Sequence, residues 1–266
     1  MRSGTLKAFP TLLRVGFADA LAYRAEFLIW VLSTNMPLVM LALWNAVARE
    51  HPIGAWGQKE FIAYFLSALI VRLLTGSWVV WEMNYEIRQG LLALRLLRPV
   101  HPLVHYAAEN LAALPLRALF ALPIAAASLY AMGAGATTTD PAMLAMFLAS
   151  VAASFLLNFA SMAIIGVLGF FIESSMALFQ VWFGGYMLLS GYLVPLPLLP
   201  GWLRATAEWL PFRFMLDFPV ELLLGRLDRL QALRLLGYQW AMCAALIVLL
   251  EYAWRLGVRR FNAYGG

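Results

Sequence analysis

Long apolar runs alternate with short polar stretches along the whole 266-residue chain. A helix needs about 20 mostly apolar residues to cross the ~30 Å hydrocarbon core of a membrane. The runs predict six membrane-spanning helices, over residues 27–47, 61–81, 106–132, 143–170, 176–194 and 237–257. The pattern therefore predicts an all-α integral membrane protein in which residues 1–266 form a single domain.

Residues 1–24 precede the first predicted span and have a different pattern. Apolar residues recur there at helical spacing: Leu6, Phe9, Leu13 and Phe17. Lys7 and Arg14 fall elsewhere around the same helix. This arrangement predicts an amphipathic helix lying in the cytoplasmic interface, with a frayed N-terminus as the alternative.

Residues 195–225 are also apolar, but prolines divide them: Pro195, Pro197, Pro200, Pro211 and Pro219. A proline interrupts a helix because it lacks a backbone N–H and clashes with the preceding turn. No uninterrupted stretch in this region reaches the length of a span. We therefore expect short re-entrant or interfacial helices between the fifth and sixth spans.

Residues 84–102, between the second and third spans, form a charged stretch between two apolar runs. At 3.6 residues per turn, Arg88, Arg95 and Arg98 lie near one side of a helix, and leucines occupy the other positions. A basic amphipathic helix of this kind is either a cytoplasmic docking element for a protein or a surface element held by anionic lipid.

Composition strengthens the membrane interpretation. Hydrophobic residues make up 63% of the chain, charged residues only 12%, and the mean hydropathy is +0.78. These values lie far from those of soluble domains. The formal charge of +5 comes mostly from arginine, and in a membrane protein it reports topology and contact with anionic head groups rather than nucleic acid.

The positions of the basic residues predict the orientation. They cluster in the N-terminal region, in residues 84–102 and in the tail: Arg2, Lys7, Arg14, Arg88, Arg95, Arg98, Arg259 and Arg260. Six spans place all three clusters on one side, which the positive-inside rule assigns to the cytoplasm. We therefore predict that both termini are cytoplasmic, although arginines between the fifth and sixth spans weaken the count.

The sequence offers little catalytic chemistry. Neither Lys7 nor Lys59 ends a phosphate-binding loop, so the chain is not expected to hydrolyse ATP by that route. The three histidines, His51, His101 and His105, lack neighbours at metal-ligand spacing, and we expect no metal site. No nucleophile triad or paired carboxylates stand out, so the chain is not expected to be an enzyme on its own.

Four polar residues fall inside or beside the predicted spans: Arg72, Glu109, Arg117 and Asn158. An arginine near the membrane centre costs about 3 kcal/mol or more, so Arg72 and Arg117 should face the bundle, a partner or water. They would line a substrate path or pair with a carboxylate such as Glu109; snorkelling or a structural interhelical pair is the alternative. Asn158 is predicted to hydrogen-bond between helices.

Two motifs carry a resemblance to a known family: EIRQGLLALRLLRPVHPL at residues 86–103 and LPGWLRATAEWLPFRF at residues 199–214. With the order of elements, they resemble the permease subunits of type-2 ATP-binding-cassette (ABC) exporters. The first motif looks like a segment of one branch of this family, whose members are small permeases encoded beside an ATPase and usually a second, related permease. The resemblance covers essentially the whole chain, and Leu92 departs from it because many relatives carry an acidic or polar residue there.

The resemblance implies a function and its partners. Residues 84–102 would be a coupling helix that docks on a separate ABC ATPase through Glu86, Arg88, Gly90, Leu91, Arg95, Arg98 and Pro99. Glu173 would make a second, smaller cytoplasmic contact, with a simple polar turn as the alternative. Two ATPase copies would bind ATP and Mg²⁺, and this chain would bind no cofactor.

The resemblance also implies a location and a class of cargo. A second permease, identical or related, would complete a dimer in the bacterial inner membrane. The complex would export a hydrophobic or amphiphilic compound of a drug-like or toxic kind. The alternatives are a lipid or polysaccharide-precursor translocator on the same scaffold, an ATP-independent secondary transporter, and a membrane-embedded scaffold protein. The spans hold few of the paired acidic residues that a secondary transporter would need.

Overall fold

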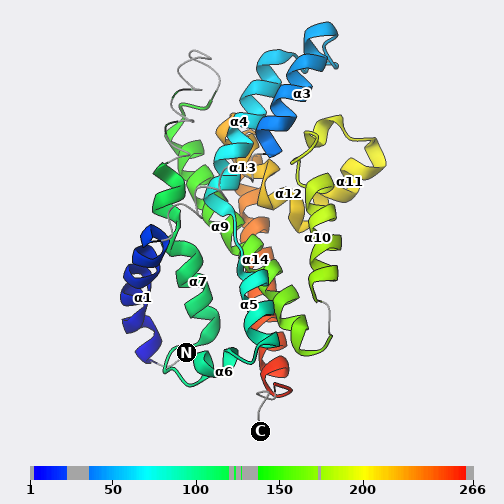
Figure 1. Ribbon diagram of the computed structural model, residues 1–266. Coiled ribbons are helices and arrows are strands. Elements are labelled where there is room, and N and C mark those ends of the chain that lie inside the picture. The colour runs from blue at the N-terminus through cyan, green and yellow to red at the C-terminus, as the bar shows by residue number, and fades with distance from the viewer. Residues whose placement is uncertain are drawn as a thin grey trace.

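The computed structural model describes residues 3–22, 36–119, 123, 127, 137–172 and 175–261. These residues are mostly helical, and within them the only β-type pairing is an isolated bridge between Ile53 and Trp56. The helices lie roughly along one direction and form an elongated bundle (Figure 1).

The helices follow one another without strands in the described part of the chain. In order they are α1 (Ser3–Ala22), α3 (Met36–Glu50), α4 (Gln58–Thr75), α5 (Val79–Arg88), α6 (Leu92–Leu96), α7 (Pro102–Ala112), α9 (Pro141–Val167), η1 (Leu168–Phe170), α10 (Ser175–Leu189), η2 (Leu196–Leu198), α11 (Gly201–Trp209), α12 (Pro211–Met215), α13 (Asp217–Leu223) and α14 (Arg229–Val258). Residues 114–119 form a further helical stretch after α7.

Three helical segments of the described chain are long and apolar enough to cross a membrane: Gln58–Arg88, Pro141–Phe170 and Arg229–Val258. They contain the predicted spans 61–81, 143–170 and 237–257. The predicted span 176–194 corresponds to α10, which is shorter at 15 residues. Parts of the predicted spans 27–47 and 106–132 lie outside the described residues, and their described parts are helical.

Helix α9 lies at the centre of the bundle and packs against α4, α5, α10, α12, α13 and α14. Its apolar residues are shared by two buried clusters. One contains Phe61, Tyr64, Leu157 and Phe214, and the other contains Met83, Tyr106, Phe159 and Trp254. Burial of this apolar surface inside the bundle gives a well-packed interior, which fixes the positions of the helices relative to one another.

Helix α14 contacts the bundle along one narrow stripe. The residues Gln239, Cys243, Leu250 and Trp254 are buried, and they recur at spacings of seven and four, which return to one side of a helix. Much of the rest of the helix is exposed and apolar, including Val248 and Leu249. Since exposed apolar side chains are stable next to lipid, this face suits the hydrocarbon region of a membrane.

The proline-rich region between α10 and α14 contains only short helices in the structure. The prolines stand at helix starts: Pro200 is the N-cap of α11, and Pro211 is in the first turn of α12. At these positions a proline removes no helical hydrogen bond. A buried bond from the Tyr64 hydroxyl to the Asp217 carboxylate, at 2.9 Å, ties α13 to α4.

Several elements meet at one end of the molecule. The start of α1, helix α6 and the end of α14 all lie at the lower end in Figure 1, whereas the connection between α3 and α4 and the start of α14 lie at the other end. Helix α1 packs against α7, where Gly16 approaches Ala112 so closely that an added Cβ would lie 2.8 Å from the Ala112 Cβ. Gly16 therefore allows α1 to lie against the bundle.

Candidate functional site

The stretch predicted as one coupling helix is two helices joined by a turn. Helix α5 ends at Arg88, and Gly90 adopts a φ of +73°, a left-handed conformation that favours glycine. Helix α6 then covers only Leu92–Leu96, and α7 begins with Pro102. The expectation of a continuous helix over residues 84–102 is therefore wrong, because Gly90 ends one helix and the prolines prevent a later one from continuing.

This break separates the three arginines that a continuous helix would align. Arg95 is buried, at 9% exposure, whereas Arg88 and Arg98 are exposed. Leu92, where the resemblance led us to expect an acidic or polar residue, is fully buried in the cluster around Met83 and Tyr106. The leucine at this position is thus accommodated as part of the core.

Arg95 is the centre of an ion-pair network. Its Nε donates to both carboxylate oxygens of Glu86, at 2.9 and 2.7 Å. Its Nη1 donates to Glu109 at 2.9 Å, and its Nη2 donates to Glu82 at 2.6 Å. One guanidinium therefore joins carboxylates from α5 and α7 to α6, and such charge-assisted bonds in a buried place are strong.

Tyr106 of α7 completes the network. The Arg95 guanidinium lies over the Tyr106 ring, 4.2 Å from its centroid, and the Tyr106 hydroxyl donates to Glu86 at 2.6 Å. Burial acts to lower the pKa of Arg95, but the bonds to Glu86 and Glu109 outweigh it and raise the pKa above its ordinary value. Arg95 is therefore charged throughout the accessible pH range and acts as a fixed cross-link.

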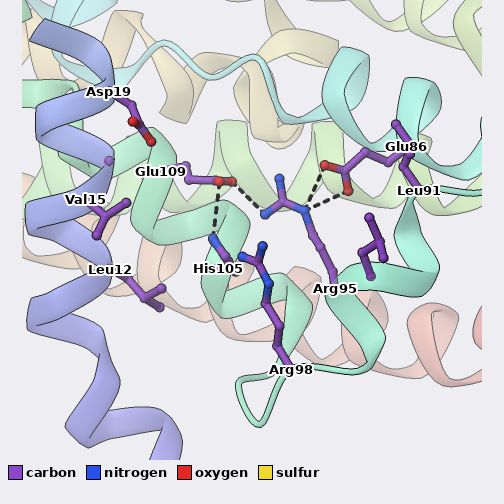
Figure 2. Close-up of a pocket in the computed structure, with 11 residues that line it drawn as sticks. Leu12, Val15, Asp19, Glu86, Leu91, Arg95, Arg98, His105 and Glu109 are labelled. Atoms are coloured by element: carbon purple, nitrogen blue, oxygen red, sulfur yellow. Dashed lines mark hydrogen bonds and ion pairs between the residues drawn. The ribbon is translucent and has the colours of Figure 1, made fainter. Parts of the chain in front are cut away.

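A pocket of about 390 Å³ opens beside this network (Figure 2). One wall is helix α1, which contributes Leu12, Val15 and Asp19, and the opposite side holds Arg95 and Glu109. The remaining lining residues are Gly16, Glu86, Leu91, Leu94, Arg98 and His105. His105 Nε2 lies 3.3 Å from Glu109. The pocket mixes both signs of charge and shows that α1 and α6 face one another at this end of the molecule.

A set of side chains at the tip of this region is exposed. Leu97 is 83% exposed and Leu94 is 60% exposed, and Arg88, Leu91, Arg98 and Pro99 are exposed with them. We call these six residues the tip surface. Exposed leucines next to arginines on a rigidly held turn are typical of a surface that a partner covers.

The remaining predicted residues lie elsewhere. Glu173 is outside the described residues. Glu109 pairs with Arg95 and His105, so the expected pairing of Arg117 with Glu109 is not what the structure has. Arg117 is fully buried in the stretch 114–119, donates to the carbonyl of Gly76 and lies 4.7 Å from the Trp78 ring centroid.

Asn158 is buried, but the bond it makes in the structure is within α9, from Nδ2 to the carbonyl of Ser154 at 3.0 Å. Gln239 of α14 does bond between helices: its Nε2 donates to the Ser154 hydroxyl at 3.0 Å and to the Phe214 carbonyl at 2.8 Å. The sequence did not lead us to predict an interhelical role for Gln239, although a glutamine inside an apolar run of membrane length indicates such a role.

No group of three or more His, Cys, Asp or Glu residues in the described part of the chain could hold a metal ion. The acidic cluster of Glu82, Glu86 and Glu109 is instead occupied by the guanidinium of Arg95. These ion pairs join α6 to α5 and α7, and the role that they suit is structural rather than catalytic.

A helical bundle with membrane-length apolar segments defines an integral membrane protein, and the comparisons give its family. The model of the family described as "ABC-2 family transporter protein" matches residues 34–265. This chain belongs to that family, and it is therefore a permease-type membrane transport subunit rather than a catalytic enzyme. The comparisons with curated proteins and with solved structures each gave no match.

Proposed function

We propose that this chain is the membrane subunit of an ATP-driven exporter that moves a hydrophobic or amphiphilic compound across the bacterial inner membrane. The family implies an ATPase partner. In our proposal two ATPase copies, with their ATP and Mg²⁺, act on a dimer of this chain or on a pair of related permeases. Both termini and the tip surface face the cytoplasm.

The observation that carries this proposal is the tip surface together with the network that holds it. A partner pressing on Leu94 and Leu97 would push on α6. Because Arg95 ties α6 to Glu82 and Glu86 of α5 and to Glu109 of α7, the push would reach both helices. Movement at the tip would then become movement of the membrane segment Gln58–Arg88 and of α7.

The structure changes which residues of this stretch we assign to docking. Arg88, Leu91, Arg98 and Pro99 are proposed to contact the ATPase, since all four are exposed and arginine pairs well with carboxylates of a partner. Glu86, Gly90 and Arg95 are proposed to shape and support the surface rather than to touch the partner. Glu173 is retained as a proposed second contact.

Co-purification tests the docking proposal. We expect Arg88→Glu combined with Arg98→Glu to abolish capture of the ATPase while the permease still inserts and elutes as the wild type does. The matched control is Arg234→Glu, an exposed arginine near the start of α14 at the other end of the molecule. If the double variant keeps its ATPase, the tip surface is not the docking site.

Reconstituted vesicles test the energy source. Transport should require ATP and should stop with an ATPase that cannot hydrolyse it. Undiminished transport with that ATPase would contradict an ATP-driven exporter and favour a secondary transporter on the same scaffold.

A further inference from the structure

Two arginines converge inside the membrane segment where α4 gives way to α5. Residues 76–78 interrupt the helical segment Gln58–Arg88 about halfway along the bundle (Figure 1). A Cβ at Gly76 would lie 3.2 Å from Nη1 of Arg72 and 3.4 Å from Nη1 of Arg117. Both guanidinium groups therefore lie close to Gly76, and a side chain at this position would crowd them.

Hydrogen bonds to Asn110 hold this break between α4 and α5 in place. Asn110 of α7 accepts hydrogen bonds from the Ser77 hydroxyl at 2.9 Å and from the Trp78 backbone N–H at 3.1 Å. The Asn110 amide in turn donates to the Tyr106 carbonyl at 2.9 Å. These bonds hold residues 76–78 in a non-helical conformation within the membrane segment. A continuous helix would have paired the backbone N–H and C=O groups there without help from a side chain.

Arg72 is the clearest indication of a ligand. It is only 8% exposed, and its Nε has no hydrogen-bond partner among the residues that the structure describes. Its guanidinium lies 5.7 Å from the ring centroid of Tyr186 on α10. None of the ion pairs within the described ranges involves Arg72. A buried cation inside a membrane protein normally has a compensating acceptor.

The neighbouring hydroxyls supply further donors. The Tyr186 and Ser190 side chains are buried, and neither hydroxyl finds a partner with good geometry in the described part of the chain. Two hydroxyls that bonded to one another would still leave one O–H without an acceptor. The cluster is therefore rich in donors and positive charge, and what complements it is a group with negative charge and several acceptor oxygens.

We propose that Arg72, with Arg117, Tyr186 and Ser190, binds the acidic head group of an amphiphile at the break around Gly76. The ligand carries a carboxylate, phosphate or sulfate, and its apolar part lies along the apolar bundle. Half-helix N-termini in discontinuous membrane helices favour anions in the same way, and α5 begins at this break. This inference rests on the proposed function, since the anionic amphiphile is the exported compound.

Fluorescence titration tests this site without ATP or a partner. The full-length chain is placed in phosphatidylcholine nanodiscs and titrated with pyrene-labelled dodecanoic acid and with its methyl ester. We expect the acid to bind at least about tenfold more tightly than the ester, since a hydrogen bond to a charged group is worth this much. In Arg72→Gln this preference should disappear, whereas Arg72→Lys should keep part of it.

Two further variants keep the result interpretable. Arg234→Gln removes an exposed arginine and should leave both affinities unchanged. Ser190→Ala should weaken the acid but not the ester, and it decides the question if Arg72→Gln does not fold. Equal affinity for acid and ester in the wild type, or an acid preference that survives in folded Arg72→Gln, would overturn the proposal.

A third arm distinguishes an exported acid from a membrane lipid with the same chemistry. The titration is repeated with phosphatidylglycerol in the nanodiscs. An unchanged affinity for the acid assigns the site to single-chain acids, whereas stoichiometric competition assigns it to two-chain acidic lipids as well; both support an anion site. An acid preference without ATP-driven transport would support the anion site and contradict the proposed export function. ATP-driven transport without an acid preference would support the export function and contradict the anion site.

Discussion

Arg95 Nε lies 2.9 and 2.7 Å from the two carboxylate oxygens of Glu86, in the part of this chain that we propose docks on the ATPase. The pair joins α6 to the last turn of α5. The short helix α6 has only five residues and is too short to be stable by itself. Its position therefore depends on this pair and on the buried Leu92.

Loss of Arg95 should destabilise the protein strongly. Arg95→Ala leaves Glu82, Glu86 and Glu109 close together without a cation, and breaking a buried ion pair in this way costs about 3 kcal/mol or more. Thermal unfolding in detergent measures the effect. Arg88→Ala, an exposed arginine seven residues earlier, is the control and should change stability by less than about 0.5 kcal/mol. Equal effects of the two changes would show that the network does not hold α6.

Gly90 should tolerate no side chain without cost. Its φ of +73° is unfavourable for residues with a Cβ, so Gly90→Ala should lower the free energy of unfolding by about 1–2 kcal/mol. Because the turn positions the tip surface, ATPase capture should weaken as well. Gly201→Ala serves as the control, since an added Cβ there meets nothing within 4 Å. A stable, fully docking Gly90→Ala would contradict the role of this turn.

Gln239 should contribute to the packing of α14 on α9. Its amide donates to the Ser150 and Phe214 carbonyls and to the Ser154 hydroxyl. Gln239→Ala removes these bonds and leaves a small cavity, so unfolding in denaturant should become easier by about 2 kcal/mol. The exposed Gln231 on the same helix is the matched site, and Gln231→Ala should have little effect. Similar values for the two variants would argue against the interhelical role.

The pair of Asp140 and Arg229 should make stability depend on pH in the acid range. Arg229 donates to both Asp140 oxygens, at 2.7 and 2.9 Å, and these bonds lower the pKa of Asp140 below its ordinary value of 3.8. A lowered pKa in the folded state gives stability that is present above pH 3.8 and is lost as the pH falls through the lowered value.

Asp140→Asn should therefore reduce the Tm modestly at pH 7, and the difference from the wild type should shrink below pH 3.8. Melting curves of both proteins across this range provide the measurement. Asp140 caps α9 by accepting from the Ala142 N–H, and Asp228 caps α14 by accepting from the Gln231 N–H. Asp228→Asn is therefore a useful comparison, because Asp228 has no ion pair in the described structure. A Tm difference that is constant with pH would exclude the ion pair as its cause.

Local sequence patterns were sufficient for the class of protein and for several elements. Apolar runs of membrane length predicted the segments containing residues 61–81, 143–170 and 237–257, because lipid requires a long apolar helix whatever its neighbours are. The prolines of residues 195–225 predicted short helices for an equally local reason. The family, too, was indicated by two contiguous motifs and is confirmed over residues 34–265.

The site depended on contacts that no local pattern contains. Helical spacing placed Arg88, Arg95 and Arg98 together, yet one left-handed glycine between them turned Arg95 inward to carboxylates on two other helices. In the same way, the cost of a charge in lipid indicated that Arg72 and Arg117 face the interior, but not that both reach Gly76. Hydropathy depends on each residue alone, whereas an ion pair or a shared site depends on how separate helices pack, and only the tertiary structure determines that.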